Sequence, residues 1–143
     1  MLAWTLVVPL LKRFFPLPAL ARLMWADERA ASPHRGQQQR IVRAARRLLR
    51  ARSRRSDENC LDRSLVLYRF LSMASLDPRV VLGVRREGDG VIGHAWVTVD
   101  GAPVVEGSVS EFIPIATIGP AGVVEAAGDE PPEAAFDALG VRA

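Results

Sequence analysis

The hydrophobic period of the chain changes once, near residue 78, and this change limits the possible folds more than any other feature. Before it, apolar residues recur every three or four positions, which predicts α-helices; after it they form short β-branched and alternating runs, which predict strands. Helices followed by strands predict an α+β fold, with N-terminal helices packed on a small antiparallel sheet.

Length and composition agree with one compact domain. The chain has 143 residues, of which 49% are hydrophobic and 24% charged, so a wholly disordered protein is excluded. We divide it into an apolar helical segment (1–31), a core (32–118) and a tail (119–143). The tail is rich in Ala, Gly, Pro and Glu, and we expect it to be loosely ordered apart from one short helix.

The N-terminal segment is apolar enough to be tested as a targeting signal. Its uncharged run, residues 1–11, contains Pro9 and is shorter than the ~20 residues that cross a bilayer. Lys12 and Arg13 follow the run, whereas a secretory signal carries its positive charge in front. We therefore expect a cytoplasmic protein whose N-terminal segment packs on the domain or on a partner protein. Contact with a membrane surface is the less favoured alternative.

Charge is divided unevenly between the two halves. Residues 1–55 contain 13 basic and 2 acidic side chains, and residues 56–143 contain 6 basic and 14 acidic ones. A predicted helix after Ser32 carries an arginine face made of Arg40, Arg43, Arg46, Arg47 and Arg50. That face is either solvated or a surface for an acidic peptide or protein. Nucleic acid is not expected, because no aromatic residue lies between Ser32 and Tyr68.

A second predicted helix begins near the only cysteine, Cys60. The cap-type and acidic run Ser-Asp-Glu-Asn precedes it, and the apolar positions of CLDRSLVLYRFLSMASL cover a broad face, so this helix should be central, largely buried and ended by Asp77-Pro78. A single cysteine excludes an intramolecular disulfide. Most lone cysteines are inert, but the free amides and positive end of a helix favour a thiolate and can hold an oxyanion.

The region after residue 78 predicts four strands. RVVLGVR and VIGHAWVTV flank a turn, and Asp100-Gly101 is a strong hairpin signal. APVVEGS returns as a third strand, and SEFIPIATIG supplies a fourth with Pro114 at its edge. A thiolate nucleophile needs a base, and the chain has two histidines. His34 lies in a predicted loop. His94 lies mid-strand between two small residues, which makes it the candidate base.

A third residue should accept a hydrogen bond from His94, and two acids are near in sequence. Asp100 is explained by its turn alone. With a two-residue loop, Glu106 opposes Ala95 and points away from His94; with a three-residue loop that includes Ala102, it shares the face of His94. The carboxylate in the apolar sequence VVEG favours the second register, and with it Glu106.

These motifs resemble a known family. CLDRSLVLYRFL, a strand ending in LGV, and GHAWVTVDGAPVVEGS are together similar to the transglutaminase-like cysteine peptidases that remove the leader in lasso-peptide biosynthesis. The resemblance covers roughly residues 37–108 and implies a papain- or transglutaminase-like α+β core with a Cys, His, Asp triad. Cys60 matches the nucleophile and His94 the base. Glu106 stands about where the family has aspartate, which is a departure.

The resemblance also implies partners: a ribosomal precursor peptide with its leader, a separate leader-recognition protein, and an ATP-dependent macrolactam cyclase. No Cys/His spacing typical of a metal site occurs, and we expect neither a metal nor a cofactor. Two alternatives to the peptidase stay open. One is acyl transfer to an amine with the same triad, and the other is a non-catalytic peptide-binding adaptor with an inert Cys60.

Overall fold

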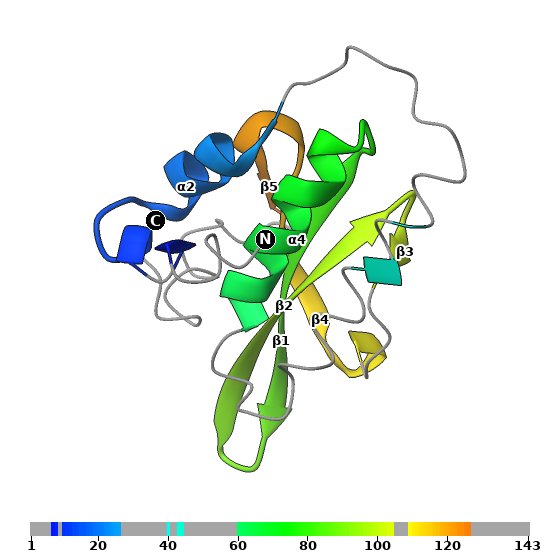
Figure 1. Cartoon of the computed structure of the whole chain (residues 1–143). Coiled ribbons are helices and arrows are strands. Elements are labelled where there is room, and N and C mark those ends of the chain that lie inside the picture. Colours follow the sequence, from blue (N-terminus) through cyan, green and yellow to red (C-terminus); the bar gives the residue numbers. More distant parts are fainter. Residues whose placement is uncertain are drawn as a thin grey trace.

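A computed structural model describes residues 7–8, 10–26, 40, 43–44, 60–104 and 109–126. Among them, helices α2 and α4 accompany one five-stranded antiparallel sheet with the order β3-β2-β1-β4-β5 (Figure 1). The predicted α+β class is confirmed. The elements are α2 (Leu17–Met24), α4 (Cys60–Met73), β1 (Pro78–Glu87), β2 (Gly90–Val99), β3 (Ala102–Pro103), β4 (Ile113–Ile118) and β5 (Val124–Ala126), with short 3-10 turns η2 (Val109–Glu111) and η3 (Pro120–Gly122).

Helix α4 lies across one face of the sheet and forms the centre of the molecule (Figure 1). Its side chains are buried on nearly all sides, as the sequence predicts. Leu82, Ala95 and Ala116, on three neighbouring strands, point from the sheet into the same core. A helix buried in this way explains the broad apolar face of its sequence.

Helix α4 ends earlier than predicted, at Met73. Ser75 adopts a left-handed conformation with φ 56°, and the N–H groups of Ser75 and Leu76 donate to the carbonyls of Ser72 and Leu71 at 2.9 and 3.1 Å. This pair of hydrogen bonds is the Schellman arrangement that satisfies the last carbonyls of a helix. Because serine takes the position usually held by glycine, the sequence offered no clear signal for it.

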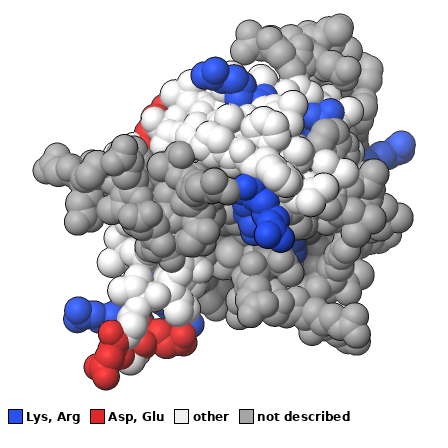
Figure 2. Space-filling view, turned by 90° about the vertical axis from the view of Figure 1, so that its left-hand side faces the viewer, with Lys and Arg blue, Asp and Glu red and all other residues white. Residues whose placement is uncertain are grey.

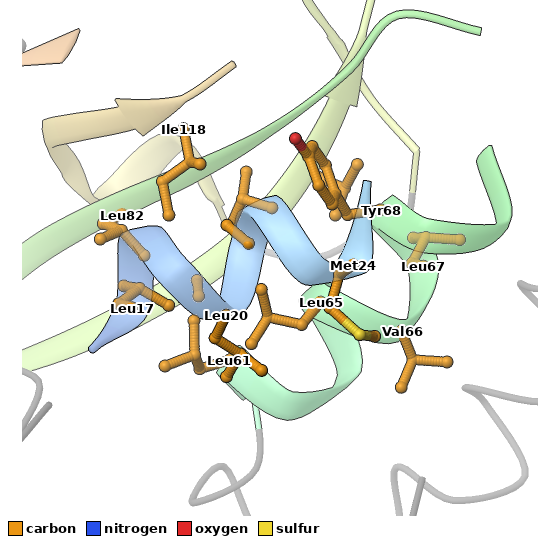
Figure 3. Close-up of a cluster of buried hydrophobic side chains, with 14 of the residues drawn as sticks. Leu17, Leu20, Met24, Leu61, Leu65, Val66, Leu67, Tyr68, Leu82 and Ile118 are labelled. Atoms are coloured by element: carbon orange, nitrogen blue, oxygen red, sulfur yellow. The ribbon is translucent and has the colours of Figure 1, made fainter. Parts of the chain in front are cut away.

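The N-terminal segment packs on the domain, as predicted. Leu17, Leu20 and Met24 of α2 are fully buried, and Figure 3 shows them facing the apolar side chains of α4. Lys12 adds an ion pair, with its Nζ 3.1 Å from Oδ1 of the buried Asp62. In the described part of the chain, no helix is long and apolar enough to cross a membrane.

The exterior near α2 is mostly uncharged. Figure 2 faces this side of the molecule and shows, among the described residues, Lys and Arg side chains spaced singly over it; an acidic cluster lies at the lower left beside further basic side chains. Leu10 and Phe14 are exposed here, Phe14 by 72%. Of the predicted arginine helix, Arg40 and Arg43 are helical and exposed, and its remaining arginines lie outside the described residues.

Residues 119–126 differ from the prediction of a loosely ordered tail. The Tyr68 hydroxyl donates to the carbonyl of Gly119 at 2.6 Å, and β5 extends the sheet by pairing with β4. Gly122 lies so close to α2 that a Cβ there would be 2.7 Å from the backbone nitrogen of Arg22. The segment is therefore packed against α2 and β4, with Gly119 and Gly122 buried, and the predicted helix further along the tail lies outside the described residues.

The fold predicts an alkaline instability that depends on Tyr68. Burial raises the pKa of Tyr68 to about 12, partly opposed by the hydrogen bond from the Gly122 amide and supported by the charge of Asp77. Since this pKa lies above the ordinary value of 10.0, the stability that the neutral phenol contributes is complete below pH 10.0 and is lost as the pH rises toward 12.

At neutral pH, Tyr68→Phe should lower the free energy of unfolding by about 1–2 kcal/mol, because the buried carbonyl of Gly119 loses its donor. Denaturant titrations of both proteins should show this difference shrinking above pH 10.0. A difference that stays constant across that range would contradict the role given to the hydroxyl.

Candidate active site

Cys60 lies in the first turn of α4, as predicted, and only 8% of it is exposed. It belongs to the apolar core together with Leu61 and Leu65. The thiol therefore lies at the amino end of the central helix, where the helix dipole favours negative charge. Asp62, in the same turn, is buried as well and pairs with Lys12.

Two hydrogen bonds establish how α4 runs along the sheet. The Ser64 hydroxyl donates to the Ala95 carbonyl of β2 at 3.0 Å, and one turn later Tyr68 reaches Gly119, just past the end of β4. Gly119 follows Ile118, which pairs with Val80 of β1, and Val80 pairs with Val97 of β2. Tyr68 therefore lies near the level of Val97, further along β2 than Ser64, which is bonded to Ala95. Helix α4 thus runs in the direction of β2, and Cys60, one turn before Ser64, lies at the level of residues 93–94.

The start of α4 lies beside the outer edge of β2. The amide of Val104, which follows β3, donates to the carbonyl of Val97 at 2.9 Å, so this carbonyl points to the outer side. Ala95 is two residues away, and its carbonyl points the same way, toward Ser64. Within the described residues, β3 pairs with β2 only over residues 97–99 and 102–104. Cys60 and His94 therefore lie at the same level along β2, and a contact between them would have to pass around this edge.

His94 faces the side of the sheet away from the α4 core. It lies opposite Gly83 in the regular β1–β2 register, and its neighbour Ala95 points into the core instead. The imidazole is half-buried and stacks on two rings. Its centroid is 4.9 Å from that of Phe112 and 6.1 Å from that of Trp96.

Gly83 makes room for this aromatic group. A Cβ on Gly83 would be 2.7 Å from the Trp96 ring and 3.0 Å from the carbonyl oxygen of Ile113. The Trp96 ring can therefore reach over β1 only because position 83 has no side chain. The close contact explains a glycine in the middle of the central strand, where glycine otherwise weakens a sheet.

The β2–β3 hairpin corrects one prediction. Thr98 pairs with Pro103 and Val99 with Ala102, so the loop contains two residues and the three-residue loop is wrong. Asp100 and Gly101 have φ values of 52° and 76°, the left-handed pair that the Asp-Gly sequence predicts for such a loop. Glu106 lies outside the described residues, so its assignment stays a prediction that the register no longer supports.

Sequence reasoning missed several residues that shape the site. Ser64 follows Cys60 by four positions, which places both on one side of a helix, and that spacing was the available signal. Phe112 and Arg85 had no signal, because the place of Phe112 beside His94 and of Arg85 beside Phe112 depends on the strand order. In the part of the chain that the structure describes, no group of three or more His, Cys, Asp or Glu side chains could hold a metal ion.

A known protein family matches most of the chain. A family model described as the transglutaminase-like superfamily matches residues 2–117. The chain belongs to this superfamily. Its members are generally cysteine-dependent enzymes and include cysteine peptidases and acyl-transferases. No curated protein and no solved structure matches the chain, and the papain-like description of the core stays a prediction.

The contact between Gly83 and Trp96 can be tested with a matched pair of glycines. Gly83→Ala should lower the free energy of unfolding by about 1–3 kcal/mol, because the indole has to move from a packed position. Its near-ultraviolet circular dichroism should change as well. Gly90→Ala is the control, since its Cβ would meet nothing closer than 3.7 Å. Equal effects of the two substitutions would contradict the contact.

Proposed function

We propose that the chain is a cysteine peptidase that removes the leader from a lasso precursor peptide, with Cys60 as nucleophile and His94 as base. The observation that carries the proposal is the position of Cys60 in a transglutaminase-like chain: it begins the helix whose second turn is bonded to β2 one residue from His94. The peptide substrate comes from the resemblance of the CLDRS and GHAWVTVDG motifs to the lasso peptidases.

The proposed reaction has two stages. The Cys60 thiolate attacks the carbonyl carbon of the scissile peptide bond, and free amides in the first turn of α4 are suited to hold the resulting oxyanion. The C–N bond breaks as His94 protonates the departing amine, leaving a thioester. His94 then takes a proton from water, the hydroxide displaces the thiolate, and the peptide leaves as a carboxylic acid.

Glu106 is proposed as the residue that orients His94. The proposal depends on the resemblance, in which the family's aspartate falls near this position. A glutamate accepts the same hydrogen bond with one more methylene of reach.

Acyl transfer is the second candidate, because the superfamily includes acyl-transferases. An amine would replace water in the second stage, and an amide would replace the acid. The proposed partners are the precursor with its leader, a separate leader-recognition protein and an ATP-dependent cyclase. An adaptor with an inert Cys60 would bind the peptide without any turnover.

Cys60→Ala and His94→Ala should each reduce leader removal by roughly a thousandfold or more, since members of a catalytic unit fail together. The assay incubates purified protein with candidate precursors, with and without a leader-recognition protein, and detects products by mass. Unfolding curves for both variants serve as the control for folding. Near-normal cleavage by either variant would exclude the mechanism.

The same assay separates the alternatives. A product ending in a free acid supports the peptidase, whereas an amide formed with added amine supports acyl transfer. An adaptor would give neither product, and its Cys60 would react with iodoacetamide at the same rate in the wild type and in His94→Ala. The proposed peptidase should react faster than this variant at mildly acidic pH.

Glu106→Gln should lower turnover by up to about 10⁴-fold, as loss of the orienting acid does in triads. Asp100→Asn is the matched control. Asparagine suits the left-handed position at φ 52°, and six residues of strand place this turn about 20 Å from His94. Full activity of Glu106→Gln, or an Asp100→Asn variant as inactive as Cys60→Ala, would overturn the assignment of the acid.

A further inference from the structure

We infer that Phe112 is a positioning residue for the proposed base, His94, an inference that rests on the proposed function. Phe112 precedes β4, and its ring lies on the face of the sheet away from α4. The phenyl and imidazole centroids are 4.9 Å apart, with 29° between the ring planes. This is the closest ring pair among the described residues.

A strand alone does not fix the plane of a histidine ring. It holds the direction of the Cα–Cβ bond, but the torsion that turns the imidazole is soft and has broad minima. Proton transfer requires one ring nitrogen to point at its partner. A stacked phenyl ring restricts this rotation, and Trp96, 6.1 Å from the imidazole, bounds it on another side.

Phe112 is itself held in place. The guanidinium of Arg85 lies over its ring, 5.2 Å from the centroid, in a cation–π contact. Arg85 forms ion pairs with Glu111, next to Phe112, and with Glu87 at 3.2 Å. Arg85 of β1 therefore holds the segment that carries Phe112 in place, and Phe112 in turn restricts rotation of the His94 ring.

The test compares Phe112→Leu, which keeps bulk without a ring, with Phe112→Tyr, which keeps the ring. Loss of stacking of this kind corresponds to about a two- to tenfold drop in the population of the stacked orientation of the His94 ring. Phe112→Leu should therefore lower kcat by about two- to tenfold with an unchanged KM, and slow iodoacetamide alkylation of Cys60 by a similar factor. Phe112→Tyr should restore both. Phe14→Leu, at a position 72% exposed, is the control and should change neither.

A spectroscopic measurement reports the stack directly. The imidazole carbon-bound protons of His94 should resonate upfield because of the Phe112 ring, and should move downfield in Phe112→Leu but not in Phe112→Tyr. Only two histidines are present, so His34→Gln assigns the signals. If Phe112→Leu does not fold, Phe112→Met is measured in its place.

The outcomes separate this inference from the proposed function. Imidazole signals that do not respond to loss of the ring, or that respond without any change in alkylation and turnover, overturn the inference. If no precursor is cleaved but alkylation slows in Phe112→Leu and recovers in Phe112→Tyr, the peptidase proposal fails while Phe112 still positions His94 toward Cys60.

Discussion

The hydrogen bond from Ser64 to the Ala95 carbonyl is the contact on which the arrangement of the site depends. It joins the helix that carries Cys60 to the strand that carries His94, at a distance of 3.0 Å and with Ser64 buried. A buried strand carbonyl needs a donor, and leaving it without one would cost about 1–3 kcal/mol. The sheet therefore accepts α4 in one register, with Cys60 one turn from the bond.

Successive side chains of β2 point to opposite faces of the sheet, so one face of the strand contributes to the core and the other carries the proposed base. Ala95 and Val97 point into the core under α4, and His94 and Trp96 point to the other side. A one-residue slip would exchange the two sets and place the imidazole among leucines. Because the packing of the core forbids that exchange, the same hydrophobic contacts that stabilise the sheet also fix the side on which the proposed base lies.

The sequence predicted the features that depend on local pattern. The helix containing Cys60, the β1–β2 hairpin and the Asp100-Gly101 turn are all confirmed. Features decided by tertiary contacts were missed. A two-residue and a three-residue loop both contain Asp-Gly, and the three-residue loop follows only from the expectation that the carboxylate in VVEG needs a partner. The Asp-Gly pair itself favours the two-residue loop, as the left-handed φ values of both residues and the pairing of Val99 with Ala102 show.

Tertiary contacts also decide the structure of the C-terminal part of the domain, which local sequence patterns did not predict. A run rich in Ala, Gly and Pro predicts a loose tail, but Tyr68 lies fifty-one positions from Gly119 and its buried hydroxyl needs an acceptor. Pro114, expected at the edge of its strand, is the second residue of β4, and β5 pairs only with residues 116–118 in the described part of the chain. Beside Pro114 the β1–β4 register shifts, between Leu82 and Gly83, and a bulge of this kind tolerates a residue without an N–H.

Asp62 shows why stability alone does not explain the region around Cys60. Removing a carboxylate from water costs several kcal/mol, which an ion pair with the partly exposed Lys12 offsets only in part, so an apolar residue at position 62 would stabilise the core as well. The ion pair does determine how the first turn of α4 is oriented against the N-terminal segment. The pair joins the N-terminal segment to the first turn of α4, and the Ser64 hydrogen bond joins the second turn to β2. The helix end that carries Cys60 is therefore held from two sides. It can neither rotate nor slide without breaking one of these polar contacts.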